Sequence, residues 1–265
     1  MIQTAEDAAK QFGDPASYDR NSALGKVSQL WAKSGDLETA IQAADRILDD
    51  SIKGDAQARI VLTQAKTGDI AGAQQTANLI QHAESKNWAQ SWIVMEQIKA
   101  GDTAGAIHTA GYIQDAIKRG WIQKEIASTQ ARAGDVVGAL KTVDRIENAA
   151  SKSQALGAVA EAQLATGNIP AALETASFIQ DVAEKGGTLR LISAAQINAG
   201  NRAGAIQTAN GIQHPWHKDR AQLPIIKALA EAGDIPAAIQ TASHIQTADP
   251  KDWAQGEIAA AQAKT

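Results

Sequence analysis

One short repeat runs through the whole chain and constrains its fold more than any other feature of the sequence. With Met1 set aside, the 265 residues divide into eight blocks of 33. One glycine recurs at the same position of seven successive blocks: Gly35, Gly68, Gly101, Gly134, Gly167, Gly200 and Gly233. Periods of about 20–50 residues are typical of solenoids and other stacked architectures. We therefore interpret the chain as an array of similar structural units.

Other positions of the repeat indicate what each unit contains. Every one of these glycines is followed by Asp or Asn, has an alanine five residues later and an isoleucine twelve residues later. Glycine fits the left-handed backbone just past a helix end, and Asp or Asn then caps the helix that follows. Pro170 and Pro236 fall in the first turn after the cap, where a missing N–H is harmless. Each glycine is therefore predicted to join two helices.

The spacing predicts two helices in each unit. The first carries apolar residues at helical spacing, as in Ala106, Ile107, Ala110 and Ile113, and is expected to end at a basic residue. The basic residues are Lys53, Lys86, Arg119, Lys152, Lys185, Lys218 and Lys251. Three of them are followed directly by a glycine that is expected to stop the helix: Gly54, Gly120 and Gly186. A second helix then runs to the next junction, with a β-branched core column of Val27, Ile60, Ile93, Ile126, Val159, Ile192, Ile225 and Ile258. Glycines inside the first helix, at 72, 105, 138 and 204, are expected to let neighbouring backbones approach closely.

A pair of helices cannot bury its apolar face alone, so stacking of the units is expected. Residues 2–34 depart from the pattern and are interpreted as an N-terminal capping or degenerate repeat. In that segment Ile2, Ala5, Ala9 and Phe12 suit a short amphipathic helix. The seven regular repeats are predicted at 35–67, 68–100, 101–133, 134–166, 167–199, 200–232 and 233–265, within a single domain.

The Gly-Asp junction, with its alanine and the next aliphatic residue, resembles the tetratricopeptide repeat. That family also pairs two antiparallel helices per unit, and the resemblance covers nearly the whole chain. At the family's aromatic positions this sequence mostly has Gln and Ala, and its closing proline is matched only by Pro250. Together with the period, the resemblance implies an all-α fold: a right-handed α-solenoid of about eight antiparallel helix pairs. It also implies a superhelical scaffold that binds protein segments in its concave groove.

Composition excludes several classes of protein. The chain has no cysteine, so disulfides and thiolate chemistry are excluded, and its formal net charge of −4 argues against a general nucleic-acid binder. No apolar run approaches the roughly 20 residues that span a membrane. The first residues, Met1 to Asp7, lack the basic and apolar stretches of a signal peptide. A cytoplasmic protein is therefore favoured, although a periplasmic or secreted protein with its signal removed would have the same sequence.

The last repeat differs from the first because it shows no alteration that would cap it. The chain stops at Thr265, one residue before the next junction glycine is due. Either the chain was cut at a repeat boundary or the parent protein continues.

One face of the second helices is the candidate partner surface, by analogy with the resembled family. Trp88, Trp92, Met95 and Lys99 follow one another at intervals of four, three and four residues and form one stripe. The flanking repeats add Arg59, Leu62, Lys66, Trp121, Lys124 and Arg132. Trp and Met outside the core columns are candidate anchors for a partner. The alternative is that these tryptophans fill gaps in an Ala-rich core, which the same placement of Trp253 favours.

Basic, amide and hydroxyl columns also recur. Two series of basic residues have two possible roles: the seven residues named above, and Lys33, Lys66, Lys99 and Arg132. They either bind an acidic partner as a row of cations or interact with the carbonyl groups at helix C-termini. We prefer the second interpretation for both series. Two glutamine columns are predicted to be buried and to fix the register between repeats: Gln64, Gln97, Gln130, Gln163, Gln196 and Gln262, and Gln57, Gln90, Gln123, Gln222 and Gln255. The threonine column (76, 109, 142, 175, 208, 241) is expected to bond back along its helix.

No catalytic constellation is recognised. His214 and His217 lie close together, but Pro215 between them and the lack of a third ligand favour surface histidines in an irregular turn over a metal site. Phosphate loops, His-Glu-x-x-His and Gly-x-Ser-x-Gly are absent from the sequence. We therefore expect no enzyme, no cofactor and no metal, but a scaffold that binds a partner protein or peptide. Self-assembly into a dimer or filament through the uncapped C-terminal repeat is the first alternative, and repeat-based RNA binding is the second and less favoured one.

Overall fold

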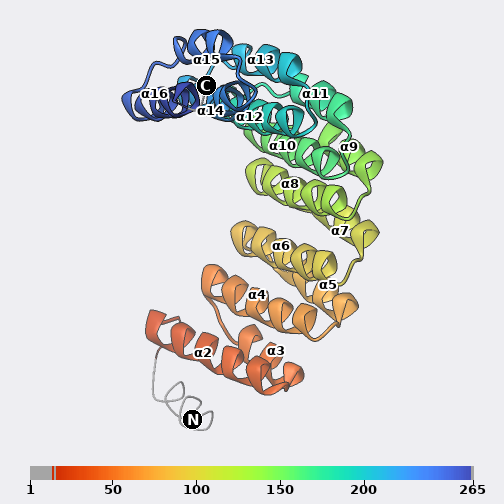
Figure 1. Cartoon of the computed structure of the whole chain (residues 1–265). Helices are drawn as coiled ribbons and strands as arrows, with labels where there is room; N and C mark the ends of the chain where they lie inside the picture. Colours follow the sequence, from red (N-terminus) through yellow and green to blue (C-terminus); the bar gives the residue numbers. More distant parts are fainter. Residues whose placement is uncertain (1–13, 15, 264–265) are drawn as a thin grey trace. The chain divides into compact units, whose positions relative to one another are not determined.

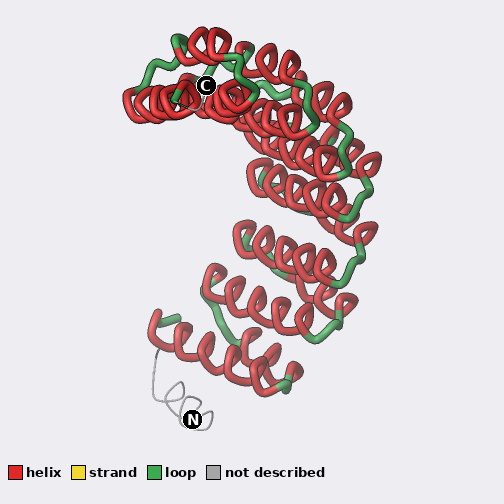
Figure 2. Tube along the Cα trace, in the orientation of Figure 1, coloured by secondary structure: helices red, strands yellow, loops and turns green. Residues whose placement is uncertain are grey.

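The computed structural model describes residue 14 and residues 16–263, and every regular element in this part of the chain is an α-helix (Figure 1). Figure 2 shows helices joined by short loops, with no strand among the described residues. The all-α helical-repeat fold predicted from the sequence is therefore confirmed. The helix expected around residues 2–12 lies outside the described residues.

Long and short helices alternate along the chain. The long helices are α2 (Tyr18–Ser34), α4 (Asp50–Lys66), α6 (Ala83–Lys99), α8 (Ala116–Arg132), α10 (Ala149–Ala165), α12 (Val182–Asn198), α14 (Pro215–Glu231) and α16 (Ala248–Gln262). The short helices are α3 (Leu37–Asp45), α5 (Ile70–Leu79), α7 (Thr103–Ala110), α9 (Val136–Asp144), α11 (Ile169–Ser177), α13 (Arg202–Asn210) and α15 (Ile235–Ala242). From α6 to α16, each long helix begins one full sequence period after the long helix before it.

The glycine junctions are built as predicted. All seven glycines have positive φ angles, between 75° and 90°, and each stands between a long helix and the short helix that follows. The Asp or Asn after each glycine is the N-cap of the short helix: Asp36 Oδ1, for example, accepts from Thr39 N at 3.0 Å. The side chain thereby satisfies a donor that the first turn of a helix leaves free.

The division between the two helices of a unit differs from the prediction. The short helices end before the basic column, so Lys86 and Lys185 stand in the first turn of α6 and α12. Their ammonium groups reach back to carbonyls of the preceding short helix: Lys86 Nζ donates to Asn78 O at 3.3 Å and Lys185 Nζ to Ser177 O at 3.2 Å. The cation thus serves a helix C-terminus, as proposed, but from the following helix. Gly54, Gly120 and Gly186, expected to stop a helix, lie inside long helices instead.

The chain divides into two compact units, residues 1–126 and 127–265. In the first unit α4 packs against α2 and against α6, while α3 and α5 each pack on the long helices before and after them (Figure 1). In the second unit α12 packs in the same way against α10 and α14, with α11 and α13 packed on these long helices. Within each unit every helix pair therefore leans on its sequence neighbours, as in an α-solenoid.

The repeated apolar columns form the cores of both units. The alanine five residues after each junction glycine is fully buried in all seven repeats, and the isoleucine column is at most 3% exposed. The β-branched column of the long helices is also buried, from Val27 to Ile258. The predicted core positions are therefore confirmed.

The register between neighbouring repeats is fixed by a column that sequence reasoning missed. Its members, buried in the long helices, alternate between polar side chains and glycine: Asn21, Gly54, Asn87, Gly120, Ser153, Gly186 and Asp219. Each polar member accepts a hydrogen bond from the loop one repeat later, as when Leu48 N donates to Asn21 Oδ1 at 2.8 Å and Gln114 N to Asn87 Oδ1 at 2.9 Å. At Gly54 the next helix instead comes so close that a Cβ would lie 2.8 Å from the Cβ of His82.

The two glutamine columns agree in part with the prediction. Most members are buried as expected, but Gln255 and Gln262 are exposed. Two of the buried glutamines bond to the next repeat: Gln130 Oε1 accepts from Thr142 Oγ1 at 2.7 Å, and Gln97 Nε2 donates to the capping Asp102 at 3.4 Å. Thr142 thus bonds to glutamine, whereas Thr241 bonds back along its helix to Ala237 O at 2.8 Å, as predicted. The glycines at 72, 105, 138 and 204 make room for the adjacent capping side chain, and not for a neighbouring backbone.

Candidate functional site

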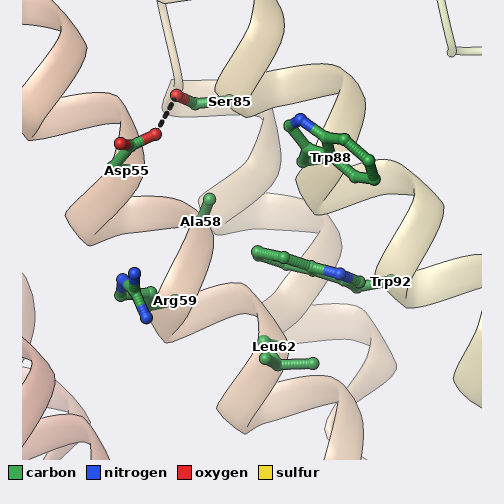
Figure 3. Close-up of a pocket in the computed structure, with 7 residues that line it drawn as sticks. All are labelled: Asp55, Ala58, Arg59, Leu62, Ser85, Trp88 and Trp92. Carbon is green, nitrogen blue, oxygen red and sulfur yellow. Dashed lines mark hydrogen bonds between the residues drawn. The ribbon is translucent and has the colours of Figure 1, made fainter.

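A pocket opens between α4 and α6 on the long-helix face of the first unit (Figure 3). Its volume is ≈ 320 Å³, and it is lined by Asp55, Ala58, Arg59 and Leu62 of α4 and by Ser85, Trp88 and Trp92 of α6. Residues three or four apart lie on one face of a helix, so each helix contributes one stripe. Because the repeat has a constant length, the stripe on α4 and the stripe on α6 lie side by side on the two neighbouring helices. The volume falls near the lower end of the range for small-ligand pockets, about 300–1,000 Å³.

Two tryptophans form the apolar wall of the pocket. Trp88 and Trp92 stack with their ring centroids 6.5 Å apart and their planes inclined by 30°. Trp88 is 43% exposed, whereas Trp92 is partly buried and packs on the core that includes Val61, Ala77 and Ile93. Trp92 therefore belongs both to the core and to the pocket, while much of Trp88 faces solvent.

Charged groups hold Trp88 at the edge of the pocket. The ammonium of Lys118, in the first turn of α8, lies 5.0 Å from the centre of the Trp88 ring. This separation is within range of a cation–π interaction. Lys118 Nζ is also 3.6 Å from Asp115 and 3.8 Å from Glu84. The backbone N–H of Lys118 donates to Asp115 and holds the pKa of that carboxyl below its usual value.

Polar side chains close the end of the pocket near the start of α6. Ser85 Oγ donates to Asp55 Oδ1 at 2.7 Å and lies 2.8 Å from His82 Nδ1 (Figure 3). Ser85 is 1% exposed and stands between the carboxylate and the imidazole. In a hydrolase triad the imidazole stands between the other two groups instead. This arrangement caps α6 and anchors it to α4, and it leaves the second carboxylate oxygen of Asp55 without a partner among the described residues.

The structure brings four of the ten predicted partner-binding residues into this pocket: Arg59, Leu62, Trp88 and Trp92. Among the other six, Met95 packs half-buried against the core around Ala106 and Ile113. Lys66 and Lys99 end α4 and α6 as predicted, and Lys99 pairs with Glu96 at 2.7 Å. None of these three lines the pocket.

The remaining three predicted residues lie on α8. Trp121 is 43% exposed and does not line the pocket, and Lys124 pairs with Glu125 at 2.7 Å. Arg132 belongs to the second unit, where it donates to Thr129 Oγ1 at 3.3 Å. A stripe of residues in the sequence therefore does not by itself identify which of its members share a pocket.

The exposure of the tryptophans bears on the alternative that they fill gaps in the core. Trp88, Trp121 and Trp253 occupy the same position of their repeats and are 43%, 43% and 40% exposed. Side chains this exposed lie largely at the surface, whereas Trp92 does pack on the core, as the alternative expects. Only Trp88 of the three has a second tryptophan one turn later on its helix, and this neighbour makes the aromatic wall.

Sequence reasoning did not identify Asp55, Ala58 or Ser85 as candidate binding residues, although all three line the pocket. Ser85 precedes Trp88 by three residues, so the helical spacing was available as a signal. Ala58 forms part of the pocket because its side chain is small, which leaves space between the larger groups.

His214 and His217 are not in an irregular turn, so that prediction was wrong. Pro215 is at the start of α14, where proline is well tolerated, and His214 is the N-cap residue. The two rings are 4.8 Å apart, and both residues pack against Gly186 of α12. Burial, with the nearby His214 and Arg190, lowers the pKa of His217.

Metal ligands do not cluster in the part of the chain that the structure describes. Its residues include no group of three or more His, Cys, Asp or Glu side chains placed to hold a metal ion. No helix among the described residues is long and apolar enough to cross a membrane.

Comparisons with known proteins add no family. No family model matches the chain, and no curated protein matches it in sequence. Among solved structures, Ton1535 from Thermococcus onnurineus matches 97% of this chain and 83% of its own length, with 16% identity and a TM-score of 0.35. A likeness this low carries no argument about function.

Proposed function

We propose that this chain is a non-catalytic protein-interaction scaffold that binds a segment of a partner protein at the pocket between α4 and α6. The observation that carries the proposal is the pair of stacked tryptophans, with Trp88 43% exposed in a pocket on the long-helix face. Tryptophan and arginine are among the residues most enriched in binding hot spots. The resemblance of the repeat to the tetratricopeptide repeat adds weight to the same proposal.

The test compares two sets of tryptophan substitutions. Once a partner has been identified, its affinity is measured by calorimetry for the intact chain, for Trp88→Ala combined with Trp92→Ala, and for Trp253→Ala. We expect the double variant to weaken binding at least 30-fold, since hot-spot truncations cost about 2 kcal/mol or more each. Trp253→Ala is the matched control, because Trp253 is similarly exposed at the same repeat position but lies on α16.

The stability of the double variant is measured beside its affinity, because Trp92 also packs on the core. Circular dichroism and a thermal melt show whether the helices remain, and Trp88→Ala alone provides a variant with little core disturbance. Undiminished partner binding by a folded double variant would refute the proposed site.

Self-association is the second candidate function, and one observation favours it. An apolar pocket between α15 and α16 is lined in part by Ile239, Ala242 and Ile258, and Ile239 is 50% exposed. Sedimentation analysis over a range of concentrations tests this candidate. We expect Ile239→Asp to abolish association that passes through this face, whereas a chain that stays monomeric at high concentration excludes the candidate.

A further inference from the structure

The pocket between α4 and α6 contains two charged groups that the described part of the chain leaves unused. Asp55 receives one hydrogen bond, from Ser85 Oγ to Oδ1 at 2.7 Å, so its second oxygen has no partner among the described residues. The guanidinium of Arg59 makes no hydrogen bond or ion pair with any described residue. Both side chains are exposed, and both line the pocket. A bound segment therefore meets one free acceptor and one free cation.

The rest of the pocket is apolar and suits a flat ring. Figure 3 shows Arg59 and Trp92 on opposite sides of the pocket, with Ala58 between them and Leu62 at the far end from Asp55. Aromatic rings pack well on tryptophan, and a guanidinium stacks on the face of an aromatic ring. A ring that enters over the small Ala58 side chain is thus flanked by a favourable group on each side.

The two free charges discriminate among the side chains that a partner can offer. A lysine or arginine would be attracted by Asp55 but repelled by Arg59, and a carboxylate would face the opposite conflict. An aliphatic side chain would fill the apolar space but offer no donor of its own to the free oxygen of Asp55. A neutral aromatic ring that bears an O–H or N–H meets both requirements, because its face stacks on Arg59 while its donor reaches Asp55.

We infer that the pocket binds a tyrosine or tryptophan side chain of the partner protein, with the ring between Arg59 and Trp92 and its O–H or N–H donating to Asp55. The inference rests on the proposed function and specifies the anchor that the partner must carry. It also assigns roles to single groups: Trp92 and Arg59 select a ring, and Asp55 selects the donor on that ring.

The first experiment selects binders without assuming a partner. Short random peptides displayed on phage are enriched on the full chain, and the enriched sequences are synthesised and measured by fluorescence anisotropy. We expect most of them to contain Tyr or Trp and to lose binding to Trp88→Ala, but to retain it with Trp253→Ala. Both chains are checked by circular dichroism first.

The second experiment isolates the hydrogen bond by a double-mutant cycle. In a selected peptide the tyrosine is replaced by phenylalanine, and both peptides are measured against the intact chain and Asp55→Ala. With the intact chain the phenylalanine peptide should bind about tenfold more weakly, as expected for a lost bond to a charged acceptor. With Asp55→Ala the two peptides should bind equally. Asp50→Ala, a change at an exposed carboxylate on α4 outside the pocket, should leave the tenfold difference intact.

A further variant separates the acceptor from the fold of the pocket. Asp55→Asn keeps an oxygen for Ser85 but removes the charge, so the preference for tyrosine over phenylalanine should shrink while α6 stays capped. The preference would remain in full if the phenol bonded elsewhere, and that result would overturn the inference.

The outcomes distinguish this inference from the function on which it rests. If selected peptides bind in a manner that depends on Trp88 but carry aliphatic or acidic anchors, the aromatic anchor is wrong and the protein-binding site stands. The same holds if replacing tyrosine by phenylalanine changes nothing. If no selected peptide depends on Trp88, both proposals fail together.

Discussion

At the residue scale, the seven junction glycines are required by the backbone and not by packing. Their φ angles lie between 75° and 90°, and a Cβ added at any of them would meet no atom within 4 Å. An L-residue with a side chain is strained in this left-handed conformation even in open space. The strict recurrence of glycine therefore has a conformational cause, which is why the sequence alone revealed the junctions.

A pair of substitutions separates conformation from space. We expect Gly101→Ala to lower the free energy of unfolding by about 1 kcal/mol, because alanine is strained at a positive φ angle. Gly256→Ala is the control, since Gly256 also has open space around it but lies inside α16. Alanine is the better helix former there by about 1 kcal/mol. Urea titrations should shift the two midpoints in opposite directions, and equal shifts would contradict the conformational explanation.

The alanine that recurs five residues after each junction glycine is fully buried in the core. Ala106 of α7 is fully buried. Ala106→Leu should therefore overpack the core and cost about 1–3 kcal/mol. Ala104→Leu makes the same change on the exposed face of the same helix, where substitutions have little effect on stability. Thermal melts of both variants check the prediction, and a stable Ala106→Leu would mean that the core yields at this position.

At the element scale, the helix boundary that sequence reasoning misplaced is the end of the short helix, where, among the described residues, a glycine cap occurs only in α7 (Gly111) and α13 (Gly211). The short helix ends before the buried isoleucine of each repeat, and the next long helix starts from capping side chains such as Asp49, Asn148 and Asp181. Apolar spacing continued across this loop, because Ile47 or Ile146 packs in the core although it follows the helix. Buried residues at helical spacing therefore do not show that one helix is continuous. The capping residues before the long helices, such as Asp49, Asn148 and Asp181, were the sequence signal for the boundary.

The register column also required geometry. Its polar members occur only in every second repeat, from Asn21 through Asn87 and Ser153 to Asp219, so no single residue type marks the column from one repeat to the next. Asp219 shows what a polar member does: its carboxylate is 1% exposed and accepts from the backbone of Gln246 and Thr247 and from the Thr247 hydroxyl. Buried groups like this one need partners, which the loop of the next repeat supplies.

Removal of one register side chain should loosen the contact between two helix pairs. In Asn87→Ala, the backbone N–H groups of Gln114 and Asp115 lose their acceptor. We expect this loss to cost about 1–3 kcal/mol. Asn78→Ala is the control, because Asn78 is exposed at the end of α5 and its side chain makes no hydrogen bond within the described residues. Hydrogen exchange should accelerate at Gln114 and Asp115 in the first variant and stay unchanged in the second.

At the scale of the whole molecule, repetition made the fold predictable and the site hard to predict. Columns that recur seven times identify the core, because chance does not repeat a buried alanine or isoleucine so often. The pocket occurs where Leu62, Trp88 and Trp92 meet, and this combination is found in no other pair of neighbouring repeats. Four residues of the predicted stripes line this pocket. Only the structure shows that Arg59 has no partner among the described residues, while Lys99 and Lys124 are paired.

The repeat architecture also predicts that a change of protonation acts locally. Burial first, then the positive charges of His214 and Arg190, lower the pKa of His217 from 6.5, so the folded chain prefers the neutral ring. As pH falls below 6.5, the His217 imidazole is protonated in the unfolded chain before it is protonated in the folded chain. The free energy of unfolding therefore declines until the pH passes the lower pKa of His217 in the folded chain. Because each helix leans on its neighbours, hydrogen exchange should accelerate mainly in α12, α13 and α14, and not in α2 to α6. His217→Gln should abolish this response, while His244→Gln, at an exposed histidine of the same unit, should preserve it. Uniform acceleration along the chain would instead show that the repeats unfold as one cooperative body.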